Sequence, residues 1–266
     1  MVTHPWPLRA PLFVPASRAN LFAKAAAAAP DAVILDLEDA VAEADKDAAR
    51  DALDRRFTDR PVIVRINPVG TPWHEADLRA VTHLQPDAVM IPKSEDLAQL
   101  AKIGAGLDGI ALLPLVETAR GLAQARQLAA LPGVRRLVFG SVDYCADLAM
   151  THDRALLLPA RSELVLASRI AGIAAPIDGV TTTLDDTDLL VEDALHARAI
   201  GMAGKLCIHP AQVAPVRQAF CPAETEIAWA RRVLAAGDGA VRIAGEMVDA
   251  PVLAKARAIL AATRES

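Results

Sequence analysis

Residues 31–41 read Asp-Ala-Val-Ile-Leu-Asp-Leu-Glu-Asp-Ala-Val, a stretch that changes character halfway. It begins as an apolar run of Val, Ile and Leu, which is typical of a buried strand. It then places three acids, Asp36, Glu38 and Asp39, within four positions. Carboxylates this close repel one another and resist removal from water. The stretch therefore predicts a core strand that ends in an unusually acidic edge.

Short apolar runs of this kind alternate with Ala-, Leu- and Arg-rich helical segments along the chain. The predicted strands are Leu8–Val14, Ala32–Leu35, Val62–Ile66, Ala88–Ile91, Ile110–Leu115, Leu137–Phe139, Pro176–Ile177 and Lys205–Ile208. Helices are predicted near 18–29, 45–56, 74–83, 95–103, 118–130, 160–172, 186–199 and 211–219. Eight β-then-α units favour an α/β fold of the closed (β/α)8 type, a TIM barrel, over an open sheet.

The end of the chain exceeds these eight units. We expect the barrel to occupy residues 1–220 and a C-terminal helical extension to occupy residues 221–266. Two helices are predicted there, from Pro222 to about Ala236 and over Pro251–Ala262, with a Gly-Asp-Gly loop between them. The extension is expected either to cap the barrel or to contact a neighbouring subunit.

Composition excludes several classes of partner. The formal net charge is −5, with 28 basic and 33 acidic residues, so no broad cationic surface for nucleic acid or an anionic membrane is expected. No apolar run approaches the length of a membrane span. The three cysteines, Cys145, Cys207 and Cys221, are widely spaced and odd in number, which favours a reduced, cytoplasmic setting.

Charged or hydrogen-bonding residues follow nearly every predicted strand, at the end where α/β barrels carry their reactive groups. These residues are Arg18, Glu38, Asp39, Arg65, Asn67, Lys93, Glu117, Asp143, Asp178 and His209. The chain has no G-x-G-x-x-G, P-loop or G-x-S-x-G motif, which argues against nucleotide-dehydrogenase, kinase and serine-hydrolase chemistry.

Glu117 and Asp143 each follow one of two consecutive strands. Two carboxylates without a thiolate or a histidine cluster suit a hard ion such as Mg²⁺, which keeps several waters or takes substrate oxygens. The alternative for Glu117 is an acid favoured by the N-terminus of the following helix, and for Asp143 a helix N-cap.

Arg65 lies inside an apolar, β-rich run, where an unpaired guanidinium would be too costly to bury. Its anion is either a structural partner, Glu38 or Asp39 on the neighbouring strand, or a substrate carboxylate or enolate oxygen. Both can hold together.

Other candidates carry weaker signals. Ser17 is expected to cap the first helix, so Arg18 and Lys24 would be solvated cations near its start. His209 ends the eighth strand and has the alternative role of simply starting a helix.

Seven segments together carry a resemblance to a known family. They are Leu12–Arg18, Leu35–Asp39, Val64–Asn67, Pro114–Ala119, Phe139–Asp143, Ile177–Gly179 and Cys207–Pro210. In these segments the chain resembles the citrate lyase β-subunit-like family of the aldolase/citrate lyase superfamily, alongside malyl-CoA and citramalyl-CoA lyases.

The resemblance implies a (β/α)8 barrel that binds Mg²⁺ through Glu117 and Asp143. It implies that Arg65 holds the substrate at the reacting centre, and that Glu38 and Asp39 contact Arg65 or the waters of the metal ion.

It also implies that Arg18 and Lys24 face coenzyme A, and that Val142 and His209 belong to the substrate- and CoA-binding set. The segment around Asp249 resembles one that carries an aspartate into the active site of a neighbouring subunit. A homotrimer or homohexamer is the expected assembly. The alternative for Asp249 is the N-cap of the last helix.

The expected activity is Mg²⁺-dependent cleavage or formation of a 3-hydroxyacyl-CoA thioester, with acetyl-CoA and a small α-keto acid as the other partners. Thioester hydrolysis is left open. One alternative is a citrate lyase β-subunit that cleaves a citryl group on an acyl carrier protein within a complex. Another is a non-catalytic CoA-binding scaffold.

Overall fold

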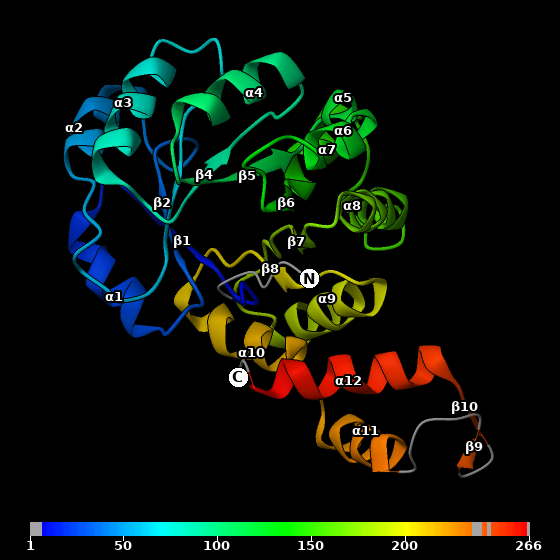
Figure 1. Ribbon diagram of the computed structural model, residues 1–266. Helices are drawn as coiled ribbons and strands as arrows, with labels where there is room; N and C mark the ends of the chain where they lie inside the picture. Colours follow the sequence, from blue (N-terminus) through cyan, green and yellow to red (C-terminus); the bar gives the residue numbers. More distant parts are fainter. Residues whose placement is uncertain (1–6, 236–240, 244–245, 265–266) are drawn as a thin grey trace. The chain divides into compact units, whose positions relative to one another are not determined.

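The computed structural model describes residues 7–235, 241–243 and 246–264 (Figure 1). The chain forms two compact units that divide between Arg217 and Gln218. None of the helices in the described residues is both long and apolar enough to cross a membrane.

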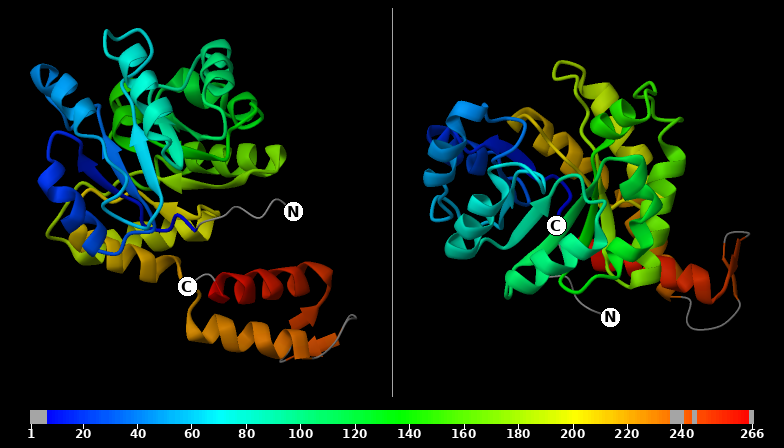
Figure 2. Two further views of the ribbon diagram at one scale, coloured as in Figure 1. Left: turned by 60° about the vertical axis from the view of Figure 1, so that its left-hand side comes forward. Right: turned by 90° about the horizontal axis from the view of Figure 1, so that it is seen from above.

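The first unit contains eight parallel strands in sequence order, as the (β/α)8 prediction requires. The strands are β1 (Leu12–Pro15), β2 (Val33–Asp36), β3 (Val62–Arg65), β4 (Ala88–Ile91), β5 (Ala111–Val116), β6 (Arg136–Phe139), β7 (Ala174–Asp178) and β8 (Gly204–Lys205). Figures 1 and 2 show the helices outside the strands. The predicted fold class is therefore confirmed.

Each strand is followed along the chain by one or two helices, which range from short to long. They are α1 (Phe22–Ala27), α2 (Lys46–Asp51), α3 (His74–Leu84), α4 (Leu97–Gly106), α5 (Ala119–Ala123), α6 (Ala125–Ala129), α7 (Ser141–Asp147), α8 (Leu158–Ala171), α9 (Thr187–Ile200) and α10 (Pro210–Phe220). Two 3-10 turns, η1 (Ala19–Leu21) and η2 (Glu43–Asp45), precede α1 and α2.

The barrel closes between its first and last strands. Leu12 and Cys207 form a parallel bridge, and the Phe13 N–H donates to the Cys207 carbonyl oxygen at 2.9 Å. At Gly204 a Cβ atom would overlap the carbonyl oxygen of Leu8, so only glycine lets the two segments approach this closely. The closure removes the open edges of the sheet.

Apolar side chains fill the barrel. Ile34, Ile63, Met90, Leu113 and Val138 belong to one cluster of buried residues supplied by consecutive strands. Because side chains alternate along a strand, the other residues of these strands are buried under the outer helices. This packing fixes the strand register, and with it the residues at the mouth of the barrel.

The structure corrects two expectations about helices. Ser17 does not cap the first helix, because that helix begins as the turn η1 with Arg18 at the capping position and no side-chain hydrogen bond. The helix predicted over 118–130 is divided at Gln124, which leaves α5 and α6 as separate short helices. The Gln124 side chain donates instead to the Glu95 carbonyl oxygen.

The second unit contains α11 (Glu224–Ala235) and α12 (Ala250–Arg264), with the antiparallel strands β9 (Val241–Ile243) and β10 (Glu246–Val248) between them in sequence. Both helices were expected from the sequence. The helices share an apolar cluster that includes Ala230, Val233, Leu253 and Ala256.

Candidate active site

A cavity of about 430 Å³ lies at the C-terminal ends of the strands, and we call it the mouth cavity. Its walls come from residues that end or follow β1, β2, β3, β5, β6, β7 and β8. The polar and charged lining residues are Asp36, Asp39, Arg65, Glu117, Ser141, Asp143 and Thr182. The apolar lining includes Phe13, Phe139, Val142, Val180 and Ile208. Five of the ten sequence-predicted site residues line this cavity, namely Asp39, Arg65, Glu117, Val142 and Asp143, and a sixth, Glu38, lies against Arg65.

Arg65 is held by a bidentate ion pair with Asp36. The register places Asp36 beside Arg65 on adjacent strands, so both side chains project to the same side of the sheet. Arg65 Nε and Nη2 donate to the two carboxylate oxygens of Asp36, each at 2.7 Å. From the sequence we expected Glu38 or Asp39 to be the structural partner of Arg65. The bidentate partner is Asp36, which that prediction missed.

Glu38 and Asp39 approach the remaining nitrogen of the same guanidinium. Arg65 Nη1 donates to Asp39 Oδ2 at 3.1 Å, and it lies 3.0 Å from Glu38 Oε2. The second contact lacks hydrogen-bond geometry, so buried Glu38 Oε2 has no donor among the described residues. The Phe13 ring lies 4.8 Å from the guanidinium carbon and covers one face of it. Arg65 is thus held by Asp36, Asp39 and the Phe13 ring. One carboxylate oxygen of Glu38 accepts no hydrogen bond from the described residues, and we call it the unfilled Glu38 oxygen.

A second cation, Lys46, supports the acidic turn from its other side. Buried Lys46 donates to the carbonyl oxygens of Leu37 and Glu38 at 2.7 and 2.8 Å, and to Asn67 Oδ1 at 2.7 Å. The Asn67 side chain in turn donates to the Leu37 carbonyl oxygen and to buried Asp77. The backbone under Glu38 is therefore held in one conformation by fully paired polar groups.

Glu117 is positioned by two unusual features of the backbone. The N–H of Lys93 donates to Glu117 Oε1 at 2.7 Å, and Lys93 adopts a left-handed φ of 46°, which is uncommon for a residue with a side chain. At Gly140 a Cβ would lie 2.5 Å from Glu117 Oε2. The strained backbone at Lys93 and the absence of a side chain at Gly140 therefore both help to position the Glu117 carboxylate.

Burial raises the pKa of Glu117 to about 8, and the nearby charge of Glu38 adds to the effect, while the Lys93 N–H opposes it. Burial likewise raises the pKa of Glu38 to about 8; Arg65 opposes this rise, and Asp39 and Asp36 add to it. A cation beside these groups would favour their charged forms. The two raised pKa values and the unfilled Glu38 oxygen fit a site built for a positive ligand.

Asp143 lies in the first turn of α7, not at its N-cap, which is Gly140. It shares the mouth cavity with Glu117, and the charge of Asp143 contributes to the raised Glu117 pKa. Within the described ranges, no three His, Cys, Asp or Glu side chains converge as a complete metal cage. Mg²⁺ does not need one, because it is commonly held by one or two carboxylates and waters.

Four predicted residues lie outside the mouth cavity. Arg18 and Lys24 are exposed, and neither has an ion-pair partner in the part of the chain that the structure describes. His209 directly precedes α10, and its Nδ1 accepts from the Ala211 N–H at 3.2 Å. Asp249 caps α12 by accepting from the Val252 N–H at 3.2 Å. The helix-starting alternatives for His209 and Asp249 are therefore correct, and their functional roles stay predictions.

Asp178, at the end of β7, forms ion pairs inside the protein and does not line the mouth cavity. Its carboxylate pairs with Arg161 Nε at 2.7 Å and Lys205 Nζ at 3.0 Å, all three being buried. Burial would raise the pKa of Asp178, but the charges of Lys205 and Arg161 outweigh it and the pKa is lowered. This triad is a buried structural network in which the Asp178 carboxylate is paired with two cations.

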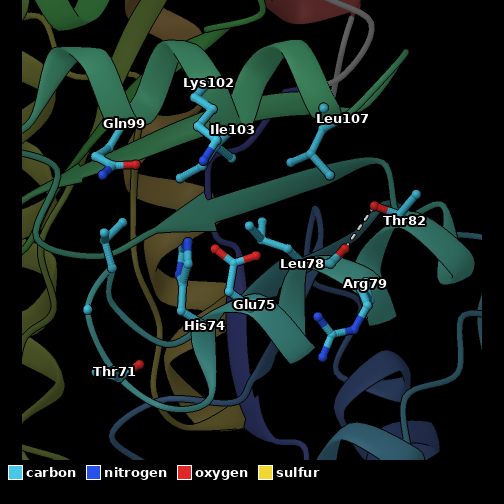
Figure 3. A pocket seen from close by; sticks show the side chains of 13 residues that line it. Thr71, His74, Glu75, Leu78, Arg79, Thr82, Gln99, Lys102, Ile103 and Leu107 are labelled. Atoms are coloured by element: carbon cyan, nitrogen blue, oxygen red, sulfur yellow. Dashed lines mark hydrogen bonds between the residues drawn. The ribbon is translucent and has the colours of Figure 1, made fainter.

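A larger hollow of about 670 Å³ lies between α3 and α4, away from these carboxylates (Figure 3). Its charged walls carry one acid, Glu75, and two cations, Arg79 and Lys102, as Figure 3 shows. His74, which also lines it, has its Nδ1 2.8 Å from the Asn67 carbonyl oxygen. Without paired carboxylates or an activated group, this hollow is less suited to catalysis than the mouth cavity.

Several known proteins resemble this chain in both sequence and fold. The citrate lyase subunit beta-like protein of Deinococcus radiodurans is 41% identical, with 95% of this chain and 96% of that protein covered. The (3S)-malyl-CoA thioesterase of Cereibacter sphaeroides is 34% identical over 96% and 94% of the two chains. The crystal structure of CitE from Mycobacterium tuberculosis with magnesium, acetoacetate and coenzyme A matches with a TM-score of 0.85 and 40% identity, covering 97% and 98%.

A family model, HpcH/HpaI aldolase/citrate lyase, matches residues 9–210, which include every residue described above for the mouth cavity. The chain therefore belongs to the HpcH/HpaI aldolase/citrate lyase family.

Proposed function

We propose that the chain is a Mg²⁺-dependent carbon–carbon lyase acting on a 3-hydroxyacyl-CoA thioester such as malyl-CoA or citramalyl-CoA. Cleavage would give acetyl-CoA and an α-keto acid, and the reverse reaction would join them. The observation that carries the proposal is the single cavity shared by Arg65, Glu117 and Asp143. The relatives that act on malyl-CoA or bind magnesium and coenzyme A support the substrate class.

Glu117 and Asp143 would hold the Mg²⁺ ion, and the unfilled Glu38 oxygen is available to a metal-bound water. When bound, the ion acts as a Lewis acid toward the keto-acid part of the substrate. The protein's own contribution is to keep both carboxylates in place in a largely buried setting, through the Lys93 N–H and the space left by Gly140.

Arg65 supplies the positive charge for the other half of the reaction. When the hydroxyl proton passes to a water molecule, the oxygen forms the keto-acid carbonyl and the carbon–carbon bond breaks, leaving its electron pair on the acetyl thioester as an enolate. A guanidinium that is already fixed by Asp36 can stabilise that oxyanion without reorganising. Protonation of the enolate carbon then completes acetyl-CoA.

We assign that protonation to Asp249, supplied by a neighbouring subunit of a trimer or hexamer. Asp249 is exposed, so its carboxyl is accessible to a second chain. Inactive Asp249→Ala and Arg65→Ala chains, when mixed after dissociation and reassembly, are expected to regain part of the activity. A mixed site that takes Arg65 from the Asp249→Ala chain and Asp249 from the Arg65→Ala chain has both residues intact, whereas the opposite combination has neither. No recovery in assemblies shown to be mixed would contradict the shared site.

The second candidate is a citrate lyase β-subunit acting on a citryl group carried by an acyl carrier protein. The resemblance to the D. radiodurans protein, which is named after that subunit, favours it. The exposed positions of Arg18 and Lys24 fit either carrier, because both present a phosphate and a pantetheine arm.

A product screen tests the proposal. The purified protein is incubated with malyl-, citramalyl- and methylmalyl-CoA, with Mg²⁺ or with EDTA, and the released keto acid is measured. We expect keto acid from at least one thioester, and none with EDTA. Inertness toward all three free CoA esters, together with cleavage of a citryl acyl carrier protein, would support the second candidate instead.

A further inference from the structure

The hollow between α3 and α4 is not used by any step of the proposed reaction. Its volume of about 670 Å³ lies within the range of roughly 300–1,000 Å³ that small-molecule sites occupy. Part of its lining is aliphatic and comes from Val69, Leu78, Ile103 and Leu107. Such a lining suits a ligand that has an apolar body of its own to bury.

Two hydrogen-bond acceptors lie side by side at the start of α3. His74 is 4% exposed, and its Nδ1 lies 2.8 Å from the Asn67 carbonyl oxygen. Because a carbonyl oxygen can only accept, Nδ1 carries the ring proton, and Nε2 of the neutral imidazole is an acceptor. Within the part of the chain that the structure describes, Nε2 has no partner. The carboxylate of Glu75 is the second acceptor, and Figure 3 shows both side chains directed toward α4.

A cation faces these acceptors from the other helix. Figure 3 shows Lys102 reaching from α4 toward His74, whereas Arg79 points away from the hollow. Neither Glu75 nor Lys102 forms an ion pair with another described residue. Both charges are therefore available to a ligand.

These groups together define the chemistry of the ligand. An ammonium group has three N–H donors, so it can bind His74 Nε2 and the Glu75 carboxylate at once. A carboxylate can pair with Lys102, and an apolar side chain can pack on Leu78 and Ile103. An ammonium, a carboxylate and an apolar body are combined in an α-amino acid with a large apolar side chain. A purely anionic ligand would face Glu75, and a purely cationic one would face Lys102.

His74 also connects the hollow to the acidic turn after β2. Its partner Asn67 accepts from Lys46 Nζ at 2.7 Å and donates to the Leu37 carbonyl oxygen at 3.0 Å. Lys46 in turn donates to the Glu38 carbonyl oxygen at 2.8 Å. A donor bound to Nε2 polarises the imidazole and strengthens the hydrogen bond of its Nδ1–H to Asn67. Occupation of the hollow would therefore hold the backbone that carries Glu38 more firmly.

We propose that the hollow is an effector site for an α-amino acid with a large apolar side chain, and that its occupation strengthens Mg²⁺ binding at the mouth cavity through His74 and Asn67. A turn that is already held in place loses less conformational freedom when the ion binds beside it. Binding of the amino acid is independent of the proposed reaction, and only its effect rests on the proposed Mg²⁺ site.

Calorimetric titration of the metal-free protein with L-leucine, L-phenylalanine and L-methionine tests the site. We expect saturable binding of at least one. The analogues of that amino acid without the amino group or without the carboxyl group should bind at least about tenfold more weakly, because each loses a charge-assisted contact. Glu75→Gln and Lys102→Met should weaken binding to a similar extent. Glu224→Gln, an exposed acid of the second unit, is the matched control and should bind as the wild type does.

Titration of Mg²⁺ with and without the saturating amino acid measures the coupling. We expect Mg²⁺ to bind at least about fivefold more tightly when the amino acid is present, and the amino acid to bind more tightly by the same factor when Mg²⁺ is present. Neither titration needs substrate or turnover, so a protein without lyase activity would still give one result or the other.

The outcomes that overturn the proposal are distinct. Absence of binding by all three amino acids at millimolar concentrations overturns the site, and so does binding that Glu75→Gln and Lys102→Met leave unchanged. Amino acid binding with an unchanged Mg²⁺ affinity overturns the effector role. If the wild type binds no amino acid and Leu78→Asp dissociates an oligomer, the hollow is covered by a second copy of the chain instead.

Discussion

Replacing Glu38 by Gln is expected to stabilise the metal-free protein at alkaline pH and to change it little at acidic pH. The Glu38 carboxyl is buried, and its pKa rises from 4.5 to about 8 on folding. Between these values the folded protein holds a proton that the unfolded chain has released. Its free energy of unfolding therefore falls as pH rises, by about 1.4 kcal/mol per pH unit for one proton.

Glutamine does not titrate, so the difference between the two proteins reports the ionisation of Glu38 together with its effect on the pKa of Glu117. From about pH 5 to about pH 8 the wild type is expected to lose about 3 kcal/mol of unfolding free energy relative to Glu38→Gln. Denaturant unfolding in EDTA at several pH values measures the difference. Glu43→Gln, an exposed acid in the next turn, is the control and should track the wild type.

Adding Mg²⁺ at the alkaline end should restore much of the lost stability of the wild type, because binding to the folded state alone stabilises it. A stability difference that stays constant with pH would show that folding does not raise the pKa of Glu38. So would a wild type that gains on Glu38→Gln as pH rises.

Two further pairs of variants separate positioning from stability. Gly140→Ala places a Cβ against the Glu117 carboxylate and is expected to weaken Mg²⁺ binding at least about tenfold by calorimetry, whereas Gly106→Ala, with open space around it, should bind as the wild type does. Asp77, which accepts from the Asn67 side chain, also accepts from Arg50 Nε at 2.8 Å. Lys46→Met and Arg50→Met each remove a cation from this network and should each cost about 3 kcal/mol of unfolding free energy. Only Lys46→Met is expected to lower kcat strongly, because Lys46 alone of the two holds the Glu38 backbone; equal kcat values would show that the network is only structural.

The architecture was predictable because eight apolar runs of strand length alternate with helical segments, and this pattern depends only on local sequence. The grouping of Glu117 and Asp143 was predictable for a related reason, since the carboxyl ends of parallel strands meet at one face of a barrel. The alternation of apolar runs and helical segments along the sequence is therefore enough to predict where the mouth of the barrel lies and which acids surround it.

The details that determine how those acids behave were not readable from the sequence. Asp36 was missed as the bidentate partner of Arg65, because that pairing depends on the register of two parallel strands. Lys46 gave no signal, since a lysine opening a helix is usually solvated and here it is buried. The left-handed backbone at Lys93 is a tertiary effect, because its N–H is required by Glu117 from the next strand.

Tertiary contacts explain why three acids lie close together at the end of β2. Asp36 holds Arg65, Asp39 adds a second contact to the same guanidinium, and Glu38 keeps one buried oxygen unfilled. Arg65 and Lys46 offset the acids from two sides. The repulsion evident in the sequence is therefore balanced by two cations, and part of it is retained as the raised pKa of Glu38.

Glu117 and Asp143 are expected to hold the Mg²⁺ on which cleavage depends, and a Mg²⁺ titration of keto-acid release measures this directly. Wild type, Glu117→Gln and Asp143→Asn are compared at a fixed concentration of the best CoA thioester. We expect saturable activation of the wild type and a half-saturating Mg²⁺ concentration at least about tenfold higher, or no activation, in both variants. Full activity in EDTA, or variants that respond to Mg²⁺ as the wild type does, would contradict it.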